Sequence, residues 1–108
     1  MPLYMTQFSM KAEAWAALAR NPEDRSVPVK AVIEKIGGRF ISMYYTFGEY
    51  DGFVISEFPD NATAMASVLS SVAPGHLTAT RTTVLLSVAE AMQGMKKASS
   101  TTLKPPKG

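Results

Sequence analysis

The chain has 108 residues, of which 46% are hydrophobic and 19% charged, and this composition indicates one globular domain with an ordinary core. It has no cysteine and one histidine, which excludes disulfides and thiolate ligands and leaves too few soft ligands for a zinc site. No apolar run approaches the roughly 18 residues of a membrane-spanning helix, and the N-terminus lacks the basic start and apolar block of a signal peptide. We therefore expect a cytoplasmic domain without a membrane partner, a metal or a cofactor.

The basic pI near 9.0 comes from the C-terminal end of the chain. Residues 1–95 hold seven basic and nine acidic side chains, and the other four basic residues are lysines after position 95. Because nucleic-acid readers carry their basic residues on the folded body, we expect no nucleic-acid partner. We expect residues 1–97 to form a single domain. Residues 98–108, rich in serine, threonine, proline and lysine, are expected to form a flexible tail, and a functional basic arm is the alternative.

The chain begins with residues 2–8, which alternate in side-chain character as a β-strand does. Ser9 is a suitable N-cap for a helix over residues 10–20, a run dominated by alanine, leucine and other helix-forming residues. The apolar face of this helix is expected to hold Met10, Ala14, Ala17 and Leu18.

Pro28 interrupts the next segment, because proline cannot donate the hydrogen bond that an established helix needs. We expect a turn over residues 23–26 and a separate helix from about Pro28. Gly37 and Gly38 predict the end of that helix. Its buried face is predicted by apolar residues at i, i+3, i+4 and i+7, which are Val29, Val32, Ile33 and Ile36.

Two runs rich in β-branched and aromatic residues, 39–47 and 52–58, are predicted strands joined by a tight turn over residues 48–51. An antiparallel sheet with one face in water should be polar at alternate positions. The first run instead has large apolar side chains on both faces, with Ile41, Met43, Tyr45 and Phe47 on one and Phe40 and Tyr44, beside Ser42 and Thr46, on the other. We therefore expect the second face to be covered as well, by a partner subunit or a ligand.

The remainder of the chain predicts a helix, a strand and a second helix. Residues 76–86 are loaded with threonine, valine and leucine and predict a strand that bends near its start. Ser87 and Glu90 match a capping box that opens a helix over residues 88–97. The earlier helix, over residues 62–73 with Asp60 or Asn61 as its cap, is expected to bury Ala62, Met65, Ala66, Leu69 and Val72.

The resulting order is β-α-β-β-α-β, with the first helical region in two pieces and one more helix at the end. With right-handed crossovers and a central hairpin, this order predicts an α+β, ferredoxin-like fold. It has a four-stranded antiparallel sheet with helices on one face and an extra C-terminal helix. The other face of the sheet would be an exposed apolar patch in a single copy, so we predict a homodimer through the sheet faces.

Several short motifs around the hairpin follow one another with a characteristic order and spacing. They are Gly37-Gly38, Tyr44-Tyr45-Thr46, Gly48-Glu49-Tyr50-Asp51, Phe58-Pro59-Asp60 and Arg81-Thr82-Thr83. Together they resemble the GYD domain family of small bacterial proteins, over roughly residues 2–95. The resemblance implies a dimeric α+β barrel of ferredoxin-like subunits and implies no established reaction. Pro28 and the stretch 73–80 depart from the family pattern, and the tail lies outside it.

Three residues are candidates for catalysis. Tyr50 and Asp51 place a phenol beside a carboxylate, which suits proton transfer. The alternative is structural, because aspartate in a turn often accepts from backbone amides and a tyrosine at a strand start packs with its polar tip in water. His76 is the only histidine and the natural general base, and the alternative is a solvated surface residue.

Aromatic residues and one arginine form a second candidate group, the lining of an apolar ligand pocket between sheet and helices. Arg81 could hold a carboxylate or phosphate there, or it could form an ion pair with Glu57 or Asp51. The aromatic residues could equally belong to the core or to a dimer interface. The pocket candidates are Trp15, Tyr44, Tyr45 and Arg81.

Two functions follow from these residues. The first is a small dimeric domain without catalytic activity that binds a small apolar or aromatic ligand. The alternative is a cofactor-independent oxygenase or isomerase of an aromatic metabolite, an analogy at the level of the fold. In that enzyme His76 would be the base, Tyr50 or Tyr44 the proton donor and Arg81 the anion holder.

Overall fold

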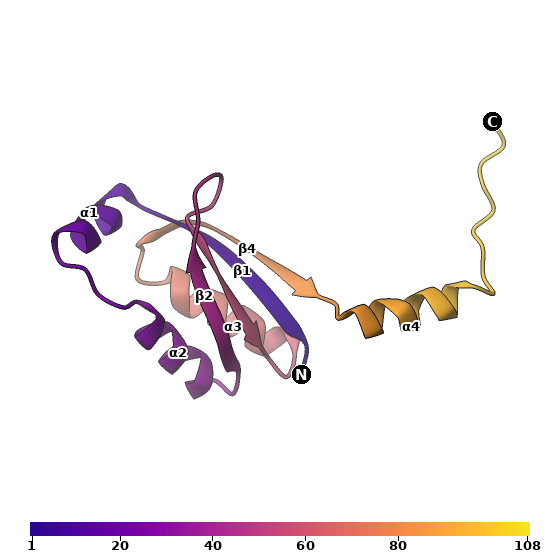
Figure 1. Ribbon diagram of the computed structural model, residues 1–108, viewed down its shortest axis with the longest axis horizontal. Helices are drawn as coiled ribbons and strands as arrows, with labels where there is room; N and C mark the ends of the chain where they lie inside the picture. Colours follow the sequence, from indigo (N-terminus) through magenta and orange to yellow (C-terminus); the bar gives the residue numbers. More distant parts are fainter.

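The computed structural model describes residues 1–108 and confirms the α+β, ferredoxin-like fold (Figure 1). The four strands form one antiparallel sheet in the order β2-β3-β1-β4. No helix is both long and apolar enough to cross a membrane. In chain order the elements are β1 (Leu3–Met10), α1 (Ala12–Arg20), α2 (Ser26–Lys35), β2 (Arg39–Tyr45), β3 (Gly52–Glu57), α3 (Asn61–Val72), β4 (Leu77–Leu85) and α4 (Val88–Ala98).

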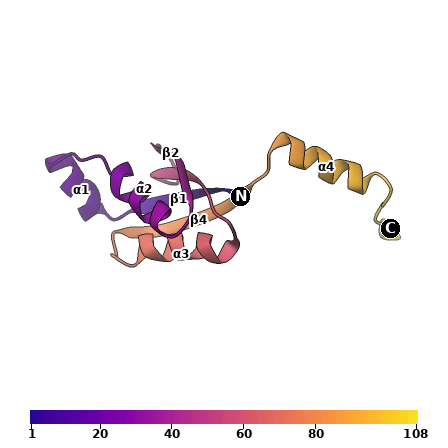
Figure 2. The same ribbon diagram turned by 90° about the horizontal axis from the view of Figure 1, so that it is seen from below.

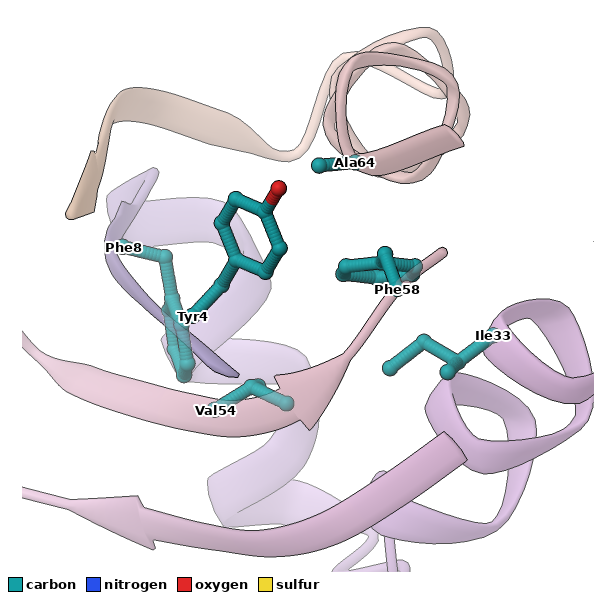
Figure 3. Packing of buried hydrophobic residues seen from close by; sticks show 6 residues of the cluster. All are labelled: Tyr4, Phe8, Ile33, Val54, Phe58 and Ala64. Atoms are coloured by element: carbon teal, nitrogen blue, oxygen red, sulfur yellow. The ribbon is translucent and has the colours of Figure 1, made fainter. Parts of the chain in front are cut away.

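The core lies on one face of the sheet, between the strands and helices α2 and α3 (Figure 3). Phe58 is only 2% exposed and its ring meets the Tyr4 ring edge to face at 5.5 Å. The Tyr4 hydroxyl donates to Asn61 Oδ1 at 2.7 Å, which ties β1 to the first residue of α3. The buried core residues are Tyr4, Phe8, Ile33, Val54, Phe58 and Ala64.

The first helix begins later than the sequence predicts. Ser9 does not cap it, because β1 continues to Met10, which pairs with Leu77 and donates its backbone N–H to Asp51. Helix α1 instead starts at Ala12 with Lys11 as the N-cap and no side-chain cap. None of its residues is buried.

The first helical region is in two pieces, α1 and α2, as predicted, but Pro28 does not mark the start of the second, so the expected helix start at about Pro28 is wrong. Pro28 is the third residue of α2, a single helix from Ser26 to Lys35. The backbone N–H groups of a first helical turn have no partner inside the helix, so proline costs no hydrogen bond there. Of the predicted buried face, Ile33 is buried, Val29 and Ile36 pack half-buried against the core, and Val32 is exposed.

Strand β2 ends at Tyr45, and its faces differ from the predicted ones. Its register against β3 shifts between Phe40 and Ser42, so the alternation is interrupted at Ile41. A bulge of this kind moves every later side chain to the opposite face. Phe40 therefore lies on the same face as Met43 and Tyr45, toward the helices, while Ser42 and Tyr44 point away from them. Phe47 lies beyond the strand and is fully exposed in the β2–β3 loop.

Helix α3 buries a different side from the predicted one. Asp60 caps it as expected, accepting from the backbone N–H of Thr63 at 2.8 Å. The residue that faces the core is Ala64, whereas Met65, Leu69 and Val72 are exposed. Asn61, which accepts from the Tyr4 hydroxyl, and Ala64 lie three positions apart, so both are on the side of α3 that faces the sheet.

Two predictions about the C-terminal elements are confirmed. The register of β4 against β1 shifts near Leu77, where a bend was expected. Ser87 and Glu90 form a complete capping box at the start of α4, with Glu90 N–H donating to Ser87 Oγ at 3.0 Å. Beyond β4, helix α4 and the tail project away from the sheet and the other helices (Figures 1 and 2).

The face of the sheet opposite the helices carries a group of apolar side chains that no element of the chain covers. We call it the open face. The register places on it one row across all four strands, with Tyr44, Phe53, Gln7 and Arg81, and a second row with Ile55 and Met5. The apolar members of the open face are Leu3, Met5, Tyr44, Phe53, Ile55 and Leu85.

Candidate functional site

A cleft of about 180 Å³ lies on the helix side of the sheet, between α2 and α3. All four strands contribute residues to its floor, and the two helices form its walls. For comparison, an apolar cavity of about 150 Å³ accommodates benzene. Nine of the 17 lining residues are hydrophobic, and they are Phe8, Met10, Val29, Val32, Met43, Tyr45, Val54, Val68 and Leu77.

Gly52 makes room for the floor of this cleft. It lies opposite Phe8 in the β1–β3 register and opposite Tyr45 in the β2–β3 register. A Cβ atom at position 52 would come within 2.6 Å of the Phe8 ring and 2.5 Å of the Tyr44 carbonyl oxygen, closer than any real side chain allows. The absence of a side chain at Gly52 therefore leaves space for the tip of the Phe8 ring, which contributes to the cleft.

The polar groups that line the cleft are basic or hydroxyl-bearing, and none is a carboxylate. Arg25 comes from the start of α2, and its guanidinium pairs at 2.7 Å with Glu23, which lies outside the lining. His76 comes from the loop before β4. Burial raises the pKa of the Tyr45 phenol, and the nearby positive charge of Arg25 acts in the opposite direction. The cleft can therefore hold an apolar body and offer donors to a polar group on it.

The turn that carries Tyr50 and Asp51 positions this cleft without lining it. Asp51 Oδ2 accepts from the backbone N–H of Met10 at 2.8 Å, and its own backbone N–H donates to the Phe8 carbonyl at 2.8 Å. Gly48 has φ of 116°, a conformation that favours glycine, and Thr46 Oγ1 donates to the Tyr50 carbonyl at 2.8 Å. The loop thus holds the end of β1, whose Phe8 and Met10 side chains do line the cleft.

The structure separates the other candidate residues between two faces. Tyr45 lines the cleft, and Trp15 of α1 lies against its ring with the centroids 5.5 Å apart. Tyr44 lies on the open face, 5.2 Å from the Phe53 ring. Arg81 is also on the open face, opposite Gln7. It has no ion pair within the chain: Glu57 lies opposite Leu3 and pairs with Arg39 at 2.8 Å, and Asp51 accepts from the Met10 backbone.

Several residues of the cleft were not identified from the sequence. Val29 and Val32 were recognised as an apolar stripe, but nothing in their spacing shows that α3 leaves a gap beside them. Arg25 and Val68 come from separate helices and carry no local motif. The glycine at position 52 was the one local signal, since glycine within a strand often marks a close approach of another group. No group of three or more acidic, histidine or cysteine side chains comes together as a metal site.

Comparisons with known proteins agree with this fold. A family model described as GYD domain matches residues 4–95. Among solved structures, the chain is similar to MtbAldR, with a TM-score of 0.59 and 13% identity over 80% of this chain and 53% of that one, so it spans about half of that structure. It is also similar to an uncharacterized NIPSNAP-like domain protein from Burkholderia xenovorans, with a TM-score of 0.50 and 12% identity over 82% and 85% of the two chains. No curated protein matches the chain. At these identities the structural likenesses show the fold alone.

Proposed function

We propose that this chain, which belongs to the GYD domain family, binds a small apolar or aromatic molecule in the cleft between α2 and α3. The observation that carries the proposal is the cleft itself, with its apolar floor and its few donors. Ligand sites are usually concave and mainly apolar, with a small number of polar groups that orient the ligand. With about 180 Å³ available, the ligand has the size of one aromatic ring with small substituents.

The only tryptophan of the chain provides the test. Trp15 packs on Tyr45, which lines the cleft, so a bound molecule should change the Trp15 fluorescence. We expect titration with toluene to give a saturable change in the natural protein. Val29→Phe should fill the cleft and abolish the change. Val27→Phe is the matched control, because Val27 lies on the same helix, is exposed and does not line the cleft.

Two results would contradict this proposal. One is a fluorescence change that does not saturate, and the other is a Val29→Phe variant that binds toluene as well as the Val27→Phe variant does. Native mass spectrometry of freshly purified protein gives a second measurement. A co-purified small molecule that is lost in the Val29→Phe variant would support the proposal and identify the natural ligand.

We further propose that the domain acts as a homodimer joined through the open faces of two sheets. The open face combines apolar residues, such as Phe53 and Ile55, with Gln7 on the interior strand β1 and Arg81 on the edge strand β4. A monomer rarely exposes a contiguous apolar patch of this kind unless it contacts a partner. Because the open face and the cleft lie on opposite sides of the sheet, dimerisation leaves the cleft accessible.

A second candidate function, catalysis without a cofactor, is favoured by one observation, the presence of His76 in the cleft lining. Tyr50, Tyr44 and Arg81 do not line the cleft. The proton donor of this second candidate function would therefore be Tyr45, which does line it. The test is turnover of the recovered ligand. The enzyme function requires that His76→Ala abolishes turnover while binding is retained, and unchanged turnover would remove His76 from the mechanism.

A further inference from the structure

Helix α4 carries an apolar stripe that contacts nothing in its own chain. Val88, Ala91, Met92 and Met95 fall at i, i+3, i+4 and i+7, the spacing by which a helix docks into a groove. We call these four residues the α4 stripe. None of them is buried, and the figures show α4 well beyond the end of β4, apart from the sheet and from the other helices (Figures 1 and 2).

A second uncovered apolar surface lies on the body of the domain. Met65, Leu69 and Val72 follow one side of α3, and the first two are 57% and 55% exposed. We call them the α3 stripe. The 12 residues of α3 include no charged side chain, although a helix with one side in water normally carries charges on that side. Nearby on β4, Val84 lies on the helix side opposite Tyr4 and is 51% exposed.

From these two surfaces we infer that the α4 stripe of one copy docks on the α3 stripe and Val84 of a second copy. The direction of the chain is the reason for choosing a second copy. Only Leu86 and Ser87 connect β4 to α4, and Ser87 is extended, with φ of −66° and ψ of 158°. The capping box begins α4 directly after this link. The chain runs outward from β4 as an arm and does not turn back over its own α3 (Figures 1 and 2).

The chemistry of the two surfaces also favours contact between copies. Both surfaces consist of methionine, leucine, valine and alanine, and neither offers a charge for recognising a polar partner. When the α4 stripe is buried, the opposite side of α4, with Glu90, Gln93 and Lys97, stays in water. If each copy donates one arm and accepts one, the two contacts are equivalent and the assembly closes as a pair.

This contact involves neither the cleft nor the open face, so it goes beyond the proposed function and its test is independent of that function. The chain has no natural cysteine, which allows engineered cysteines to report the contact. One variant carries Met92→Cys on α4. Three others carry Met65→Cys, Leu69→Cys or Val72→Cys, which together cover the length of the α3 stripe whatever the register. All four positions are exposed in the single chain, so the fold should be retained, as circular dichroism would verify.

Each α3 variant is mixed with the Met92→Cys variant under reducing conditions and then oxidised. One of the two proteins carries an affinity tag, so that heterodimers separate from homodimers by mass. A heterodimer can form only between copies, because each copy has one cysteine. Gln93→Cys is the matched control, since it is the next residue along α4 and faces away from the stripe.

We expect at least one α3 variant to form about tenfold more heterodimer with Met92→Cys than with Gln93→Cys, because docking raises the effective concentration of the paired thiols. If each of the three α3 variants forms as much heterodimer with Gln93→Cys as with Met92→Cys, the inference is wrong. The Leu69→Cys/Met92→Cys double variant provides a further test. If it forms a disulfide within single chains while the mixtures form no heterodimer, α4 folds onto its own α3 and the inference is wrong.

Discussion

Both faces of the sheet carry large apolar side chains, but the chain covers only one of them. On the helix side, α2 and α3 bury Tyr4, Phe8 and Val54 and leave the cleft between them. On the open face, Phe53 and Ile55 stay half-buried and Tyr44 is exposed. Because neighbouring residues of one strand point to opposite faces, the same six residues of β3 serve both purposes. The helix side holds the buried core of the single copy, and the open face is the side to which we assign contact with a second copy.

The largest expected effect is a loss of stability when the core on the helix side is changed. Phe58→Ala removes the most completely buried large side chain and its contact with the Tyr4 ring, so we expect the free energy of unfolding to fall by about 3–5 kcal/mol. Urea denaturation measures this loss. Phe53→Ala removes a phenyl ring from the open face. It should lower the free energy of unfolding clearly less than Phe58→Ala does, when both are measured at concentrations where the protein is monomeric. Equal losses would show that the two faces do not differ as the structure indicates.

The next effect is on association. Ile55→Glu places a charge on an interior strand of the open face, and we expect light scattering at micromolar concentration to show a smaller assembly for the variant than for the natural protein. Ala31→Glu on the exposed side of α2 is the control and should keep the assembly of the natural protein. A natural protein that is already monomeric would contradict the proposed open-face dimer.

A smaller loss of stability is expected at Gly52, which lies between the Phe8 ring and the backbone of Tyr44. Gly52→Ala brings a methyl group against the Phe8 ring and the Tyr44 carbonyl, and we expect a loss of about 1–3 kcal/mol in urea denaturation. Gly94→Ala is the control. Nothing lies within 4 Å of a side chain at position 94, and alanine favours helix, so we expect α4 to gain about 0.5–1 kcal/mol of helix stability. If Gly52→Ala left the free energy of unfolding unchanged, β2 and Phe8 would be able to move apart at little cost, and the close packing at Gly52 would not contribute to stability.

The smallest effect concerns pH. Hydrogen bonds from Thr63 lower the pKa of Asp60 below its ordinary value of 3.8, and the hydrogen bond from Arg39 lowers the pKa of Glu57 below 4.5. Carboxylates with a lowered pKa stabilise the folded state above their ordinary pKa, and this contribution is lost as the pH falls through the lower, folded values. Asp60→Asn keeps a capping oxygen but cannot titrate.

We therefore expect the urea midpoint of Asp60→Asn to fall less than that of the natural protein between pH 7 and about pH 3. Glu34→Gln is the control, because Glu34 makes no side-chain hydrogen bond, and its pH profile should follow the natural one. An Asp60→Asn profile as steep as the natural one would show that the cap of α3 contributes nothing to acid sensitivity.

Local patterns in the sequence predicted the elements well. Alternation and composition identified all four strands, and the capping residues Asp60, Ser87 and Glu90 were identified correctly because their partners lie within three residues. The errors occurred where a distant residue competes with a local rule. Met10 joins β1 and not α1 because Asp51 accepts its N–H from 41 positions away.

The candidate site was predictable only in part. Tyr45 and His76 were named and do line the cleft, whereas Arg25, Val29 and Val68 were not. The cleft exists because two helices that are far apart in the sequence leave a gap over the sheet, and no local pattern carries that information. The same limit explains Tyr44 and Arg81, which looked like pocket residues until the register placed them on the open face.

The element order, the ferredoxin-like topology and the family were predictable from the chain alone, because they depend on periodicity, on caps and on motifs whose parts lie close together. Which side chains share a face depends instead on pairing between distant residues. A bulge at Ile41 exchanges the two sides of β2, and the bond between Tyr4 and Asn61 sets which side of α3 meets the sheet. Both effects depend on pairing between distant parts of the chain, and they help to decide which apolar groups form the core, which line the cleft and which remain uncovered.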